Sequence, residues 1–235
     1  MTTKQRLKQY TGRLSAAEIS EGMNAAGENA LRLRRDAERL LEAGSFATAA
    51  SLAILCVEEA GKLSILRGLA VVKTQKELAA RWKDYRTHTA KNSLVFLLDR
   101  VAAGARCLEG FRPLFATDSE HSHVAENLKQ IALYTDCLGH RHWSKPIDVV
   151  SESLARTLVE VARVITASAS PVTVREVELW QQHMGAVWGS SESEMKLALV
   201  HWHDALVAEG IKPKDESGEM ESFVFGLHSR HPRVS

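Results

Sequence analysis

The sequence predicts an all-α protein, an antiparallel helical bundle with a C-terminal helical extension. The chain of 235 residues has only five prolines, so few positions would interrupt a helix. Apolar residues recur at steps of three and four over long segments, which is the period of one helix face. No run alternates apolar and polar residues as a half-buried strand does. Hydrophobic residues make up 45% and charged residues 25%, as in ordinary globular proteins.

Two long helices are expected first, over residues 15–43 and 45–72. The first has a single apolar stripe, and Gly44 would end it. The short connection at 43–45 favours an antiparallel hairpin. The second helix has few polar faces and is expected at the centre of the bundle. Its most regular stripe consists of Ala49, Ala53, Cys56, Ala60 and Leu63.

The rest of the chain predicts further helices separated by breaks. Residues 73–88 form a polar segment, 91–108 a third helix, 110–123 a loop, 123–137 a fourth helix and 151–169 a fifth. Two helices follow Pro171, and the last begins with the capping box Ser191-x-x-Glu194. We therefore expect a bundle over residues 1–170, a two-helix extension over 171–212 and a polar tail over 213–235.

Composition restricts the class of partner and the compartment. The formal net charge of +1 argues against binding nucleic acid or membrane by bulk charge, but leaves room for a local basic pocket. The three cysteines form no CxxC pair, so we expect reduced thiols in the cytoplasm. The N-terminus lacks the apolar core of a signal peptide, and the apolar run 52–57 is too short to span a bilayer. No membrane association is expected.

The first candidate group interrupts the second helix with Glu58, Glu59 and Lys62. One interpretation is a surface pair of Glu58 with Lys62, with Glu59 reaching to water. The other is that Glu59 faces inward and is held by a basic residue of another helix, because a half-buried carboxylate without a partner is costly. Spacing alone leaves both interpretations open, but because the helix is apolar on most sides we expect Glu59 to be the inward carboxylate.

Two further groups lie on the later helices. His88 and Lys91 share a stripe that would face the second helix, or else they form a solvated first turn. The helix dipole would favour the neutral form of His88. Lys129 and Asp136 share a face of the fourth helix, with Tyr134 offset from it. A tyrosine at a helix end also commonly packs its ring and uses its hydroxyl as a hydrogen-bonding group.

Metal and cofactor sites are not expected. The His-x-His pairs point to opposite sides of a helix, so they would need loops and carboxylates to close a site. The adjacent Glu58 and Glu59 are similar to part of a di-iron site, but the central helices contain no Glu-x-x-His. The chain also lacks a Walker loop and a Gly-x-Ser-x-Gly motif.

The order of the motifs carries more information than their spacing. Residues 49–62 end in Glu-Glu-Ala-Gly-Lys, followed by His88-x-x-Lys91, by "KQIALYTD" at 129–136 and by "WSKP" at 143–146. This order resembles the AbiV family of abortive-infection proteins, which is similar to the HEPN (higher eukaryotes and prokaryotes nucleotide-binding) helical superfamily. The resemblance covers about residues 25–167.

The resemblance implies a HEPN-like fold and bacterial defence against phage by shutting down the infected cell. Many HEPN relatives are metal-independent ribonucleases and dimerise. Their Arg stabilises phosphate charge, and their His, separated from the Arg by four to six intervening residues, acts in proton transfer. Arg81 and His88 have the loosest form of this spacing, whereas Arg141, nearer the usual position, is adjacent to His142.

We therefore expect an anti-phage protein that acts on RNA or translation, as a homodimer, with Glu59, Lys62, Arg81, His88 and Lys91 as catalytic residues. The binding residues would be Glu58, Lys129, Tyr134, Asp136 and Arg141. Whether the protein is an enzyme stays open. The alternatives are a non-enzymatic helical module that binds a phage protein or ribosomal component, and a structural partner of a toxin.

Overall fold

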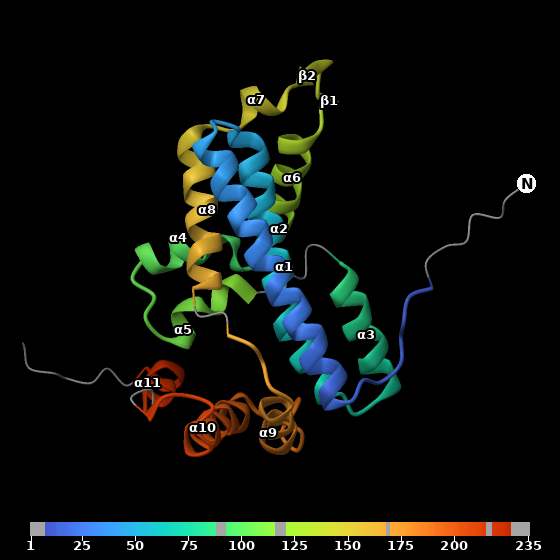
Figure 1. Cartoon of the computed structure of the whole chain (residues 1–235), viewed down its shortest axis with the longest axis vertical. Helices are drawn as coiled ribbons and strands as arrows, with labels where there is room; N and C mark the ends of the chain where they lie inside the picture. The colour runs from blue at the N-terminus through green and yellow to red at the C-terminus, as the bar shows by residue number, and fades with distance from the viewer. Residues whose placement is uncertain (1–7, 88–92, 116–120, 168–169, 215–217, 227–235) are drawn as a thin grey trace, which may run out of the picture.

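The computed structural model describes residues 8–87, 93–115, 121–167, 170–214 and 218–226. Two long helices, α1 (Ala16–Glu42) and α2 (Phe46–Ala70), run antiparallel through the centre of the molecule (Figure 1). Helices account for nearly all of its regular structure, with one two-stranded sheet in the described residues. The all-α prediction is confirmed.

The α1–α2 hairpin forms as the sequence predicts. Ser15 accepts a hydrogen bond from the backbone of Glu18, and the Glu18 carboxylate returns to the backbone of Ser15, so this capping box fixes where α1 begins. Gly44 has a φ of 75°, in the left-handed region that favours glycine, and this allows the chain to reverse into α2.

Two shorter helices complete a bundle of four around α2. They are α6 (His121–Leu133) and α8 (Glu152–Thr166), and both pack against α2 (Figure 1). The predicted stripe of α2 lies in the bundle core, where Ala49, Ala53 and Cys56 are fully buried. Many of these core side chains are small, which lets the helices approach closely. The expectation that the second helix is central is confirmed.

The segment between α2 and α6 differs from the prediction. Residues expected as a polar segment form α3 (Gln75–Arg86), which Thr74 caps and which buries Leu78 and Trp82. The prediction of one continuous helix over 91–108 is wrong for residues 93–108, which the structure describes. The chain instead forms the 3-10 helix η2 (Ser93–Phe96) and the short α4 (Leu97–Ala102), which ends before Gly104 at φ 93°. The expected loop contains part of α5 (Leu108–Phe111), η3 (Arg112–Phe115) and the start of α6.

A β-hairpin follows α6 where the sequence predicted only a longer helix and a break. Strands β1 (Asp136–Leu138) and β2 (His142–Ser144) pair antiparallel, and α7 (Pro146–Val149) connects them to α8. The hairpin extends beyond the end of the bundle (Figure 1). Strands of three residues are too short to show alternation in the sequence.

The C-terminal extension lies at the opposite end of the bundle from the hairpin (Figure 1). It consists of α9 (Val174–Met184), α10 (Glu192–Ala208) and α11 (Glu219–Phe225). The predicted capping box of Ser191 and Glu194 is present, whereas α11 occupies part of the expected polar tail. The indole of Trp180 donates to the carbonyl of Arg67, 2.9 Å away, so α9 is tied to the end of α2.

The connection before α9 is also tied to the bundle. The side chain of Asn24 both donates to the carbonyl of Val172 and accepts from its N–H, at 2.9 and 2.7 Å. Ser20 donates to the same carbonyl at 2.7 Å. Within the ranges that the structure describes, no helix is long and apolar enough to cross a membrane.

Candidate functional site

A buried charged cluster joins α2 to α6. The Lys129 ammonium lies 2.7 Å from a carboxylate oxygen of Glu58 on α2 and 2.7 Å from one of Glu126, one turn earlier on α6. The side chains of Lys129 and Glu58 are only 5% and 4% exposed. We call Glu58, Glu126 and Lys129 the buried cluster.

The charges of the buried cluster stabilise one another. Burial by itself lowers the pKa of Lys129, but the hydrogen bonds and charges of Glu126 and Glu58 outweigh burial and raise that pKa above its ordinary value. Lys129 is therefore a cation at neutral pH. A buried ion of this kind is tolerated only while its partners remain in place. With its central side chains almost fully buried, the cluster is suited to holding α2 and α6 in register.

The inward carboxylate is Glu58, and the prediction that Glu59 takes this role is wrong. Glu59 instead pairs with Lys62 on its own helix at 2.6 Å, and both side chains are 19% exposed. The predicted surface pair of Glu58 with Lys62 is wrong for the same reason. Successive residues of a helix differ by about 100° in direction, and α2 is apolar on most sides, so the sequence could not decide between two adjacent carboxylates.

The pair Glu59–Lys62 lies where α3 meets α2. The Lys62 ammonium is 5.2 Å from the centre of the Tyr85 ring, and Tyr85 in turn packs edge-on against Trp82. A cation over an aromatic face gains electrostatic stabilisation. We call Glu59, Lys62 and Tyr85 the partly exposed group. Its ion pair retains access to solvent, unlike Glu58 and Lys129 at the centre of the buried cluster.

Arg81 makes its ion pair and its ring contact with residues outside both groups. It pairs with Asp84 on α3 at 3.2 Å, and its guanidinium lies over Trp188 at 5.9 Å. Its side chain also covers Gly68, where a β-carbon, if one were added, would come within 3.3 Å of it. Gly68 is ten residues beyond Glu58, about 15 Å along the helix. His88 and Lys91, with the proposed pairing of Arg81 and His88, lie outside the described residues.

The remaining predicted binding residues are separated from Glu58 and Lys129 by the end of α6. Tyr134 is 62% exposed. Asp136 in β1 accepts a hydrogen bond from the N–H of Cys137 at 2.7 Å. Arg141 is at the tip of the hairpin with a φ of 68°. Of the predicted site residues in "KQIALYTD", Lys129 thus lies in the interior and Tyr134 and Asp136 lie in an exposed segment, so no single site contains all three.

Glu126 completes the buried cluster and was not predicted from the sequence. The only signal was its position three residues before Lys129, which is common on exposed helix faces. Across the described ranges, no group of three or more His, Cys, Asp or Glu residues is arranged to hold a metal ion.

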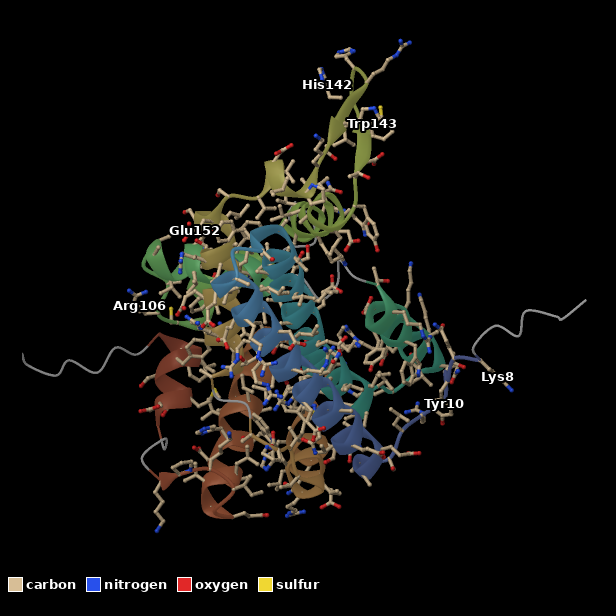
Figure 2. The ribbon with its side chains drawn as sticks, turned by 45° about the horizontal axis from the view of Figure 1, so that its top comes forward. Lys8, Tyr10, Arg106, His142, Trp143 and Glu152 are labelled. Atoms are coloured by element: carbon tan, nitrogen blue, oxygen red, sulfur yellow. The ribbon has the colours of Figure 1, made fainter. Side chains whose placement is uncertain are left out.

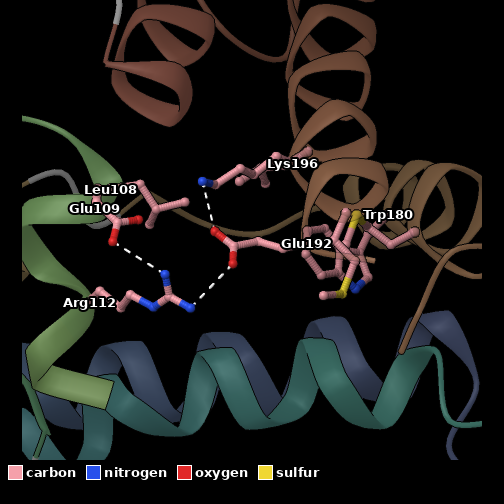
Figure 3. A pocket seen from close by; sticks show the side chains of 9 residues that line it. Leu108, Glu109, Arg112, Trp180, Glu192 and Lys196 are labelled. Atoms are coloured by element: carbon pink, nitrogen blue, oxygen red, sulfur yellow. Dashed lines mark hydrogen bonds and ion pairs between the residues drawn. The ribbon is translucent and has the colours of Figure 1, made fainter. Parts of the chain in front are cut away.

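A separate cavity lies between α5–η3 and the C-terminal helices. Its volume is about 300 Å³, and Figure 3 shows a chain of ion pairs across it, from Glu109 through Arg112 and Glu192 to Lys196, at 3.2, 3.4 and 2.8 Å. Its apolar lining consists of Leu108, Trp180, Met184, Met195 and Leu199. The charges on this cavity pair with one another, so it offers no obvious anion or cation site.

The four helices packed around a charged central helix define the class of all-α bundle proteins. The family model HEPN_AbiV, described as AbiV, matches residues 18–167, and the chain belongs to the AbiV family. The matched range includes the buried cluster, the partly exposed group and the β-hairpin, and ends before α9. No curated protein and no solved structure matches the chain at a significant level.

Proposed function

We propose that this protein is an anti-phage abortive-infection protein that acts on RNA or the translation machinery. The observation that carries the proposal is the match to the AbiV family over the whole four-helix bundle. That range contains the Glu-Glu-Ala-Gly-Lys sequence of α2, whose first carboxylate is held by Lys129 and whose second is held by Lys62.

The partly exposed group supports a ribonuclease form of this function. Its cation and carboxylate are 2.6 Å apart and reach solvent. Lys62 would stabilise the charge of an RNA phosphate, and Glu59 would accept the proton of the ribose 2′-hydroxyl as it attacks phosphorus. His88, proposed to return a proton to the leaving 5′-oxygen, lies outside the described residues.

A non-enzymatic form is favoured by a different observation. Glu58, Glu59, Lys62, Arg81 and Lys129 each contact an opposite charge. Charges that are already paired within the bundle are less available to the phosphate or the ribose hydroxyl of a substrate. In this form the bundle binds an RNA, a ribosomal component or a phage protein, and shuts down the cell without cutting RNA.

The test combines phage challenge with an RNA cleavage assay. Bacteria that express the wild type are expected to stop growing when infected and to give fewer plaques over a panel of phages. Lys62→Met and Glu59→Gln are compared with Lys196→Met, which changes a lysine outside the matched range. The ribonuclease form predicts that purified wild type fragments RNA without added metal, and that both variants of the group lose fragmentation at unchanged helical content.

The outcomes separate the two forms. Growth arrest without RNA fragmentation, or fragmentation unchanged in both variants of the group, would overturn the ribonuclease form and leave the binding form. Normal growth and normal plaque numbers in cells that express folded wild type would overturn the proposed function itself.

A further inference from the structure

The strands of the β-hairpin are exposed along nearly their whole length. It continues directly from α6 and projects away from the bundle, with His142 and Trp143 toward its far end (Figure 2). Twelve large hydrophobic side chains are exposed in the described residues, and four of these fall within 134–147. They are Tyr134, Leu138, Trp143 and Ile147. Exposed apolar side chains gathered in one short segment indicate an interaction surface.

The register of the strands places Trp143 on a face without carboxylates. Trp143 lies opposite Cys137, and residues opposite one another point to the same side of an antiparallel pair. Asp136, the acidic residue of the two strands, belongs to the neighbouring register position and therefore points to the other side. Lys145 follows in an extended conformation, two residues after Trp143, which places it on the side of the indole.

The cationic side chains next to Trp143 in the sequence are exposed. In the part of the chain that the structure describes, the side chains of Arg141 and Lys145 make no hydrogen bond or ion pair. The same is true of His140 and His142. Arg163 and Arg175, by contrast, each contact two glutamates.

The backbone conformation at the hairpin tip is also unfavourable for Arg141, the residue at that position. Arg141 has a φ of 68°, the left-handed region where glycine or asparagine is preferred. An arginine at this position costs conformational free energy and makes no compensating contact in the described residues. Such outliers are found more often at functional sites than elsewhere.

We infer that the hairpin binds single-stranded RNA. An unpaired base would stack on the Trp143 indole, while Arg141 and Lys145 contact the flanking phosphates. A flat indole beside unpaired cations fits a chain of bases and phosphates, whereas an apolar protein surface would leave these cations without partners. The inference rests on the proposed function, and assigns to it the segment that captures the RNA.

The experiment measures the binding of a fluorescent 12-nucleotide RNA without base pairing, by anisotropy at low and moderate salt. Trp143→Ala is expected to weaken binding about 10- to 100-fold, and Trp143→Phe, which keeps a ring for stacking, by less than about 3-fold. The plot of log K against log salt has a negative slope, and Arg141→Gln and Lys145→Gln are each expected to make it shallower by about 0.7. Arg35→Gln, which changes an exposed arginine of α1, is the matched control and should leave both quantities unchanged.

Three results would overturn the inference: wild type that does not bind the RNA, equal affinity of wild type and Trp143→Ala, and an equal loss in Arg35→Gln. Binding of an acidic protein through the hairpin, with no RNA bound, would also overturn it. Phage challenge of cells that express wild type, run beside the binding assay of the hairpin variants, separates the two proposals. If wild type still protects cells while the hairpin variants bind RNA normally, the inference fails and the proposed function stands.

Discussion

Lys129 in the middle of α6 has two carboxylates at 2.7 Å, whereas Arg141, beyond the end of the same helix, contacts no carboxylate in the described residues. Both residues belong to the stretch whose motifs resemble the AbiV family. In the first region the charge is almost fully buried, paired and structural. In the second the charge is exposed, unpaired and free for a partner. Charged residues close together in sequence can therefore serve stability and recognition separately.

The largest effect is expected from removing the buried cation. Lys129→Met removes the cation that compensates the buried charge of Glu58, which should lower the free energy of unfolding by about 3–5 kcal/mol. Urea denaturation followed by circular dichroism measures this loss. Lys196→Met, which removes the solvent-facing pair with Glu192, should give a small fraction of that loss.

A double-mutant cycle makes this test specific. Glu58→Gln together with Lys129→Met should cost less than the sum of the two single changes, because each change removes the same interaction. Additive losses, or a loss in Lys129→Met no larger than in Lys196→Met, would show that the buried cluster does not stabilise the bundle.

The second effect is a loss of stability at alkaline pH. Folding raises the pKa of Lys129 above its ordinary value of 10.5, so its contribution is complete below that pH and is lost as pH rises through the folded value. Burial raises the pKa of the Cys56 thiol from 9.0 to about 12. This shift also makes the folded state less stable as the pH rises, because the thiol of the unfolded chain ionises first. The unfolding free energy of wild type should be flat near neutral pH and fall above about pH 9.

Denaturation of Lys129→Met over the same pH range isolates the contribution of the lysine. The variant should keep the decline due to Cys56 and lose the additional decline above pH 10.5. Identical pH profiles for the two proteins would assign the alkaline decline to other groups.

The smallest effect leaves stability unchanged and concerns thiol reactivity. Cys137 on the hairpin is exposed, whereas Cys56 is fully buried and its raised pKa keeps it protonated at neutral pH. A maleimide should therefore label Cys137 rapidly and leave Cys56 unlabelled in the folded protein, as read by mass spectrometry after digestion. Equal labelling rates would mean that the bundle opens as readily as the hairpin.

The sequence was informative wherever an apolar stripe was long. α1, α2 and α8 agree with their predicted ranges to within a few residues, and the second helix was correctly placed at the centre. α3 was missed because Leu78 and Trp82 are its only two buried residues, too few to define a period. The hairpin was missed because its strands have three residues each and depend on pairing with one another.

The candidate site was predicted in composition but not in arrangement. The sequence singled out Glu58 and Lys129, yet it could not pair them, because they are separated by 71 positions and meet only when α6 packs on α2. It also selected the wrong neighbour as the inward carboxylate. Periodicity identifies the face of a helix well when one side is polar, and α2 has little polar surface to serve as a reference.

The hydrogen bonds between Asn24 and Val172 set a limit on where the chain can be divided. The family match ends at residue 167, which suggests a convenient place to truncate the protein. Cutting there would remove the peptide group that satisfies Asn24 and would bare Ile19 and Met23, which pack with Val172 and Val177. A fragment ending at 167 would therefore expose an apolar surface at this end of the bundle and self-associate through it. A fragment that retains α9 keeps this surface covered.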